Sequence, residues 1–315
     1  MRKKTAKKRK PASRRRKKST KRKFFTPRLF SFLVLLGLLF FSVVAAGYVI
    51  FFRTAIAHGA INDNDTAAIA FEEPYLDAPE LPADIPPVED KSLPMVAIII
   101  DDMGYHEKIG NELLALPMNL TFSFLAAAPH TRELEEQAFQ SGRVVLLHLP
   151  MEPKGKEWDP GPGALLVGQS SEEQKTLFNR NLEGVPHAVG VNNHMGSRYT
   201  QDRGAMDTLM PLLRAEGLFF VDSVTTSRSE GVAAARSAGV PTARRHIFLD
   251  NVVSQDKVCE QLQNLVASAE NKGWAIGIGH PNQATLTALS MCRETLLDRV
   301  NLMSVQELVG RLNRN

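Results

Sequence analysis

The chain has 315 residues, 43% of them hydrophobic and 23% charged, which is typical of a globular protein and excludes a wholly disordered or fibrous chain. Its net charge of +4 is unevenly distributed: residues 1–28 hold 16 Lys or Arg and no acid, whereas the remainder holds 22 basic and 34 acidic residues, about −12. The basic character therefore belongs to the N-terminal tail, which could bind nucleic acid or anionic lipid through its charge, and no specific nucleic-acid partner is expected.

The tail is followed by an uncharged apolar segment of 24 residues, LFSFLVLLGLLFFSVVAAGYVIFF, over 29–52. About 20 such residues suffice for a helix to cross a bilayer, so we expect a single transmembrane helix there. A cleaved signal peptide is the alternative, suggested by the AIA sequence at 55–57, but its apolar region would span only ~7–15 residues.

The charges that flank this segment predict its orientation. Basic residues precede it and acidic residues dominate after it, so the positive-inside rule predicts a cytoplasmic tail over 1–28 and an extracytoplasmic remainder. We therefore expect a single-pass protein of the bacterial cytoplasmic (inner) membrane with a periplasmic domain. The tail is expected to set the orientation and to attract anionic lipid head groups.

Residues 53–94 are acidic and rich in proline, a composition typical of an extended linker. The folded domain is predicted over 95–315. Its two cysteines, Cys259 and Cys292, each lie in a helix-like stretch, and both a disulfide and two buried thiols are compatible with this pattern.

The domain begins with the apolar run Val96–Ile100, which is typical of a strand buried on both faces. Further strands are predicted over 120–126, 144–149, 187–194, 218–222, 246–251, 274–279 and 301–303. Helices are predicted over 107–116, 131–141, 170–182, 207–216, 233–238, 255–271 and 285–299, with a last helix at the C-terminus. Alternating strands and helices favour a distorted (β/α) barrel of about 7–8 parallel strands. The alternative is a doubly wound open sheet, which would need a glycine-rich phosphate turn after the first strand, and DDMGYH is not one.

Polar side chains of catalytic type follow the ends of these apolar runs. They are Asp101, Asp102, His148, Asn193, His194, Asp222, Asp250 and His280. In a barrel the carboxyl ends of all strands lie on one face, so we expect these side chains to converge there. The adjacent carboxylates Asp101 and Asp102 are expected on opposite sides of an extended backbone, so that one can bind a cation while the other acts as a base.

One carboxylate and two imidazoles are the ligand set of a hydrolytic metal site, with Zn²⁺ the expected ion; we predict Asp102, His148 and His194 as ligands. Asp101 is predicted as the general base and His280 as the general acid. Further predicted site residues are Asp222, which could orient a histidine or bind substrate, and the substrate-binding candidates Asn193, Arg198, Arg228 and Asp250.

Several short motifs carry a family resemblance. They are the DD pair at 101–102, HLPMEP at 148–153, NNHMGS at 192–197, FVDS at 220–223, FLDN at 248–251 and IGHP at 278–281. In this order they resemble the divergent branch of the polysaccharide deacetylases, related to the NodB-type carbohydrate esterases, over about residues 95–312. The resemblance implies a distorted barrel and a metal-dependent amide or ester hydrolase of acetylated sugars.

The chain departs from the main family at one metal ligand. That family uses the first Asp of the pair as base and the second as ligand, and it takes both histidines from one HxxxH motif. Here Leu149, Pro150, Met151 and Glu152 follow His148, so the second histidine must come from elsewhere, and NNHMGS supplies His194.

Two functions follow as expectations. The first is a membrane-anchored, metal-dependent deacetylase of a cell-envelope polysaccharide or peptidoglycan glycan, acting on an N-acetyl amide rather than an O-acetyl ester. The second is a catalytically inactive deacetylase-like module that binds glycan or an envelope or division partner protein. The missing HxxxH motif favours the module, whereas the presence of both Asp101 and His280 favours the enzyme.

Overall fold

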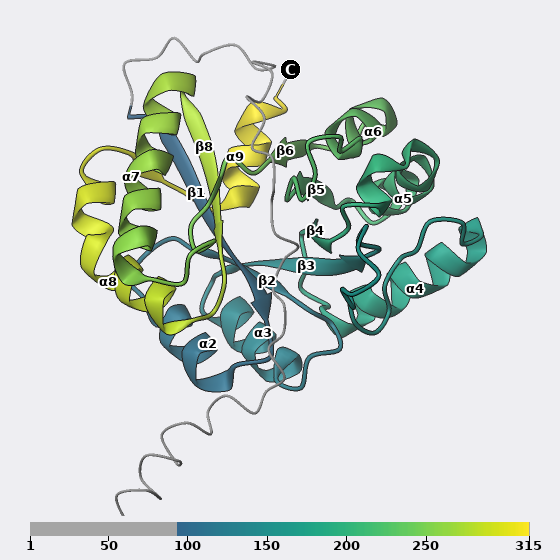
Figure 1. Cartoon of the computed structure of the whole chain (residues 1–315), viewed down its shortest axis with the longest axis horizontal. Helices are drawn as coiled ribbons and strands as arrows, with labels where there is room; N and C mark the ends of the chain where they lie inside the picture. Colours follow the sequence, from purple (N-terminus) through teal and green to yellow (C-terminus); the bar gives the residue numbers. More distant parts are fainter. Residues whose placement is uncertain (1–92, 315) are drawn as a thin grey trace, which may run out of the picture. The chain divides into compact units, whose positions relative to one another are not determined.

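The computed structural model describes residues 93–314, apart from the side chains of residues 295 and 297, and shows helices packed around one parallel sheet (Figure 1). The strands are β1 (Met95–Met103), β2 (Thr121–Phe124), β3 (Val144–Met151), β4 (Gly190–Met195), β5 (Phe219–Asp222), β6 (Thr242–Arg244), β7 (Ile247–Phe248), β8 (Trp274–Gly279) and β9 (Asn301–Leu302). The helices are α2 (Glu107–Leu114), α3 (Thr131–Gln140), α4 (Ser171–Gly184), α5 (Arg203–Ala215), α6 (Gly231–Ala238), α7 (Gln255–Lys272), α8 (Gln283–Leu297) and α9 (Val305–Leu312), with a short 3₁₀ turn at Tyr199–Gln201.

The predicted tail (1–28), transmembrane helix (29–52) and nearly all of the predicted linker lie outside the described residues. None of the helices in the described part combines the length and apolar character that a membrane crossing requires.

The sheet has the order β6-β5-β4-β3-β2-β1-β8-β7, with β9 paired to β1. Every strand pair is parallel, as expected for strands that alternate with helices. The two edge strands, β6 and β7, are separated in the chain by only Arg245 and His246, so the chain itself connects the two edges of a curled sheet. The predicted α/β fold with barrel-like parallel strands is confirmed at this level.

The two faces of the sheet belong to two separate apolar clusters. On one face, alternate residues of β1 such as Val96 and Ile98 pack with side chains of α2 to α8. On the other face, Ala97 and Ile99 pack with residues of β3, β5 and β8 and with Val305 of α9. Helices α2 to α8 therefore cover one side only, which distinguishes this sheet from a doubly wound one. The side that carries Ala97 and Ile99 is called the inner face below.

Local sequence signals account for several element ends. Ser170 accepts a hydrogen bond from the Glu173 backbone N–H, and the Glu173 carboxylate accepts one from the Ser170 N–H, which forms a capping box at the start of α4. Helices α6 and α7 end at Gly239 and Gly273, whose φ values of 71° and 83° lie in the left-handed region.

One strand prediction was wrong in detail. A continuous strand was expected over 246–251, but the chain forms β6 before it and only the two-residue β7 within it. At the break the Arg245 guanidinium donates to the Ser223 and Val224 carbonyls and lies 3.5 Å from the Phe248 ring centroid. The Arg245 backbone N–H still donates to the Asp222 carbonyl of β5, whereas the next N–H, that of His246, donates to the Ile276 carbonyl of β8.

The two cysteines form a disulfide between α7 and α8, which settles the alternatives that the sequence left open. Cross-linking residues 33 apart restricts the unfolded chain, and loop-closure entropy assigns this about 3–4 kcal/mol of stability. We expect the Cys259→Ser, Cys292→Ser double variant to lose roughly 2–4 kcal/mol of unfolding free energy in urea titrations. Equal stability of the variant and the oxidised parent would contradict this expectation.

His246 is expected to make the protein less stable in acid. Its Nδ1 accepts from the Ile276 N–H at 3.2 Å, and its ring packs edge-on against Trp274. Burial, followed by the positive charges of Lys272, Arg244 and Arg245, lowers the pKa of His246 to about 3. The unfolded chain, with a His pKa near ~6.5, then binds a proton that the folded chain excludes, so stability falls below pH ~6.5, by about 2 kcal/mol at pH 5.

The His246→Asn variant provides the measurement. Asparagine can accept the same backbone bond but does not titrate, so the unfolding free energy of this variant should lose less between pH 7 and pH 5 than that of the parent. His130→Asn, which makes the same substitution at a partly exposed position, serves as the matched control. If the unfolding free energies of the parent and of His246→Asn fall equally between pH 7 and pH 5, the lowered pKa of His246 is not the cause of the acid sensitivity.

Candidate metal centre and active site

The site side chains continue the inner-face rows of the strands. Asp101 follows Ile99 by two residues, and His148 and His280 follow Leu146 and Ile278 in the same way. Since alternate residues of a strand share a face, the apolar inner face becomes polar at the carboxyl ends of β1, β3 and β8. Strand β4 contributes Asn192 and His194 by the same rule, and its register places Asn192 beside His148.

Asp102 departs from this alternation through its backbone. Its φ of 51° lies in the left-handed region, and the register between β1 and β2 shifts between Ile100 and Met103. The turn brings Asp102 to the same side as Asp101, and both carboxylates approach Nε2 of His148, at 3.2 Å from Asp102 and 3.7 Å from Asp101. The expectation that the two carboxylates point to opposite sides was therefore wrong, because it assumed an extended backbone.

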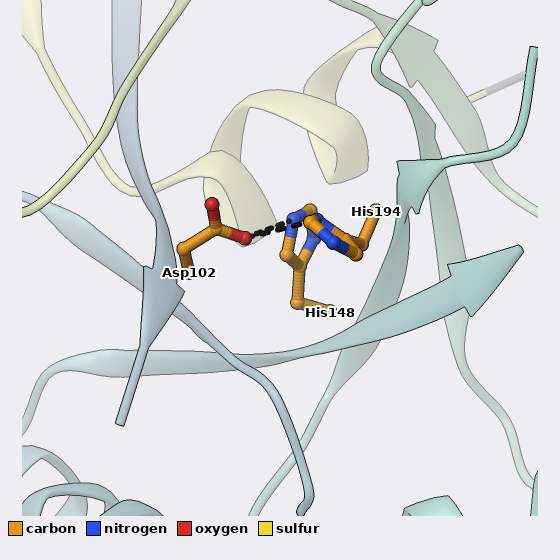
Figure 2. A group of neighbouring side chains, drawn as sticks. All are labelled: Asp102, His148 and His194. Carbon is orange, nitrogen blue, oxygen red and sulfur yellow. Dashed lines mark ion pairs between the residues drawn. The ribbon is translucent and has the colours of Figure 1, made fainter. Parts of the chain in front are cut away.

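Asp102, His148 and His194 come together as one buried group (Figure 2). The Oδ1 atom of Asp102 lies 3.2 Å from His148 Nε2 and 3.0 Å from His194 Nδ1. Both carboxylate oxygens and these two ring nitrogens are buried without a hydrogen-bond partner among the described residues.

These features fit a metal ion. Four buried polar atoms without hydrogen bonds are costly unless a cation engages them. Ligand atoms about 2.0–2.1 Å from a tetrahedral Zn²⁺ lie about 3.3 Å from one another, close to the distances within this group. The three side chains predicted from the sequence thus make a candidate divalent metal centre, while their roles as ligands stay a prediction.

The electrostatics of the group suit a cation. Burial would raise the pKa of Asp102, but the charge of His194 and the contacts with His148 outweigh it and hold this pKa far below its usual range. Burial raises the pKa of Asp101, although the charges of His148 and His280 and the Asn192 amide oppose it. Burial would lower the pKa of His148, but Asp101 and Asp102 raise it overall. The two buried carboxylates therefore attract positive charge, whether a proton or a metal ion.

His280 forms a dyad with Asp250. The Asp250 carboxylate accepts from the His280 backbone N–H at 2.7 Å and contacts the ring Nδ1 at 2.9 Å. Thr285 and Asn282 also donate to it, at 2.7 and 2.8 Å. Burial would raise the pKa of Asp250, but the His280 charge and these hydrogen bonds lower it overall, so the carboxylate stays ionised and orients the imidazole.

Asp222 and Asn193 occupy strand positions that alternate with the inner-face residues. Asp222 accepts from the Ser229 hydroxyl and the Val224 N–H, and Asn193 contacts the Met195 carbonyl and the Ser223 N–H. These contacts organise the loops that follow β4 and β5. These contacts give no support to a catalytic role for Asp222. The predicted role of orienting a histidine fits Asp250 instead, because its carboxylate contacts Nδ1 of His280.

The two arginines predicted to bind substrate lie on exposed loops. Arg198 is 55% exposed and donates to Glu152 Oε1 at 2.7 Å. The other oxygen of Glu152 accepts from the Val167 N–H, so this carboxylate closes the loop over 153–166. Arg228 is exposed in the loop after β5. Arg198 thus has a structural contact, and substrate binding by either arginine stays a prediction.

The prediction of site residues missed Asn192. Its Nδ2 donates to both oxygens of Asp101, each at 2.9 Å, and its Oδ1 lies 3.0 Å from His148 Nδ1. The sequence did contain the signal, because Asn192 precedes His194 by two residues and must share its face of β4. Taking strand-end polar residues without regard to the face they share predicts the adjacent Asn193 instead.

Comparisons with known proteins show the family and the fold of this chain. The model of a family described as divergent polysaccharide deacetylase matches residues 98–309. The uncharacterized protein YibQ of Escherichia coli (strain K12) is 35% identical over 215 residues, which cover 68% of this chain and 67% of that protein. An uncharacterized protein of Haemophilus influenzae (strain ATCC 51907 / DSM 11121 / KW20 / Rd) is 36% identical over 222 residues, covering 70% and 77%. The crystal structure of the uncharacterized protein ATU2773 from Agrobacterium tumefaciens C58 has a similar fold, with a TM-score of 0.66 at 24% identity over 71% of this chain and 92% of that one.

Proposed function

The chain belongs to the divergent polysaccharide deacetylase family, and on this premise we propose that it is a metal-dependent hydrolase that removes acetyl groups from a cell-envelope glycan. The observation that carries the proposal is the buried group of Asp102, His148 and His194, with Asp101 beside it and His280 within electrostatic reach. An N-acetyl amide of a polysaccharide or of the peptidoglycan glycan is the proposed substrate, in preference to an O-acetyl ester.

The three proposed ligands would hold Zn²⁺, since two imidazoles and one carboxylate are a donor set that this ion accepts at catalytic sites. When bound, such an ion polarises a carbonyl group and makes a nearby water more acidic. Asp102 is suited to this position, because its carboxylate stays ionised across the neutral range.

Asp101 and His280 would move the protons. Asp101 takes a proton from the attacking water as that water adds to the acetyl carbonyl carbon, and Asn192 holds the carboxylate in place with bonds to both oxygens. The carbon–nitrogen bond then breaks, and His280 donates a proton to the leaving nitrogen, so that acetate and a free amine are released. Asp250 contacts Nδ1 of His280 and steadies the imidazolium.

The test combines metal analysis with acetate release from N-acetylglucosamine oligomers and from peptidoglycan. We expect about one divalent ion per chain and acetate release in the parent. In Asp101→Asn we expect the ion to be retained and the rate to fall roughly 10²–10⁴-fold, because this change removes the base and no proposed ligand. Stoichiometric metal without acetate release from any acetylated glycan would refute the proposed deacetylase activity but not the proposed metal site.

A non-catalytic glycan-binding or partner-binding module is the second candidate. The burial of the centre favours it, because Asp101, Asp102 and His148 are each 0% exposed and His194 only 2%. Glycan binding that Asp101→Ala and His280→Ala leave unchanged, together with no turnover in the parent, would decide for the module. Acetate release that depends on Asp101 would decide for the enzyme.

We also propose that the domain lies on the periplasmic side of the bacterial cytoplasmic membrane, anchored by residues 29–52 with the basic tail near anionic lipid. The disulfide between Cys259 and Cys292 supports this location, since such bonds persist in oxidising compartments. An alkaline phosphatase domain fused after residue 94 should then be active in cells. An inactive fusion that is nevertheless expressed would place the domain in the cytoplasm.

A further inference from the structure

Asn192 lies between Asp101 and His148, and the contacts allow its side-chain amide only one orientation. The Nδ2 atom is 2.9 Å from both carboxylate oxygens of Asp101 and 3.2 Å from the Ser223 hydroxyl. An ionised carboxylate only accepts hydrogen bonds, so the NH₂ group must face Asp101 and the carbonyl oxygen must face the other way.

The orientation of the amide determines the tautomer of His148. The Oδ1 atom of Asn192 accepts from the Ser123 hydroxyl at 2.5 Å and lies 3.0 Å from His148 Nδ1. An amide oxygen has no proton to give, so Nδ1 of His148 must carry the proton and donate it. A neutral imidazole has only one such proton. Its Nε2, the atom 3.2 Å from Asp102, therefore presents a lone pair to the metal centre.

We propose that Asn192 is the positioning residue of this site, and that its one amide fixes both the metal-binding nitrogen of His148 and the direction of Asp101. The inference rests on the metal site of the proposed function. It goes beyond that function because one side chain, Asn192, then sets the geometry of both the proposed base, Asp101, and a proposed ligand, His148. Asn192 is 0% exposed and its polar contacts are all with other buried side chains of the inner face, so solvent does not compete for them.

The first test needs no substitution of Asn192. In the full chain labelled with ¹⁵N at its eight histidines, the His148 signals are identified by their absence from His148→Gln. At alkaline pH and without metal, we expect a proton on Nδ1 and none on Nε2. Added Zn²⁺ should shift the Nε2 signal while the Nδ1 proton stays. A neutral His148 ring with its proton on Nε2 and none on Nδ1 in the metal-free protein would overturn the proposal, whatever the protein does to glycans.

The second test separates the two halves of the amide. Asn192→Leu removes the acceptor, so we expect Zn²⁺ affinity in a competition titration to fall roughly 10–100-fold. Asn192→Asp keeps an acceptor for His148 but replaces the NH₂ group that holds Asp101 with an oxygen, so the protein should still bind Zn²⁺ while kcat falls. Ser123→Ala removes the second donor to the same oxygen and should leave the His148 tautomer unchanged.

These outcomes distinguish a positioning role from a merely structural one. A folded Asn192→Leu protein with parental Zn²⁺ affinity would refute the proposal. If Asn192→Leu does not fold, the tautomer of the parent chain and the affinity of Asn192→Asp decide in its place. Of these readouts only kcat requires turnover. The positioning role of Asn192 can therefore be refuted without refuting the deacetylase activity, and the deacetylase activity can be refuted without refuting the positioning role.

Discussion

The His194→Ala protein is expected to lose its divalent metal ion and, with it, all detectable acetate release. His194 Nδ1 lies 3.0 Å from Asp102, and its imidazole is one of only two in the buried group. Loss of a residue that merely supports a ligand costs up to about 100-fold in affinity, so loss of a ligand itself should cost more than about 100-fold. Metal content after dialysis and a competition titration measure the effect.

His187→Ala is the matched control. His187 is also near carboxylates, since it stands with Glu135 and Glu136 in a second group of metal-binding side chain types among residues 93–314. Its Nδ1 and backbone N–H already contact the Glu135 carboxylate, at 3.0 and 2.9 Å, which is the pattern of a structural pair. We expect this variant to keep its metal and activity. Metal retained in His194→Ala but lost in His187→Ala would assign the metal to the group of His187, Glu135 and Glu136 instead.

The His280→Ala protein is expected to turn over roughly 10²–10⁴-fold more slowly while keeping its metal, because it loses the proposed general acid and no proposed ligand. His280 lies against Asp250, and its charge acts on Asp101, so it stands beside the proposed base without belonging to the metal group. Single-turnover acetate release and metal analysis on the same sample separate these two properties.

The pH profile provides an independent check on this role. A general acid must be protonated to act, so the parent kcat/KM should fall at alkaline pH as His280 loses its proton, and this decline should be absent from His280→Ala. An alkaline decline that survives the substitution would remove His280 from the acid role. Asp250→Asn should lower the rate by a smaller factor, because the imidazole remains but is no longer held by a charged partner.

The sequence predicted the site best where period-two alternation holds. His148 and His194 sit at inner-face positions of β3 and β4, and parallel pairing puts Asn192 next to His148, so His194, two residues further on, lies on the same face as His148. The same rule, applied strictly, would have selected Asn192 over Asn193 and marked Asp222 as facing the other way. Taking every polar residue at a strand end as a site residue adds Asn193 and Asp222, whose site roles stay predictions.

Three features depend on the fold and not on any local pattern. The left-handed backbone of Asp102 places two adjacent carboxylates on one side, which no extended strand allows. Asp250 meets His280 because their parallel strands β7 and β8 are adjacent, although the residues are 30 apart in the chain. The cysteine pair is decided in the same way, by helices α7 and α8 that pack side by side.

The sequence alone determined the alternation of strands and helices, the parallel sheet, the family and the three side chains of the candidate metal centre, because each rests on periodicity or on residue types at strand ends. Only the tertiary structure decided which neighbouring polar groups face one another. That choice depends on a single positive φ at Asp102 and on contacts such as those of Asn192 with Asp101, 91 residues away, and such long-range geometry leaves no local signature in the chain.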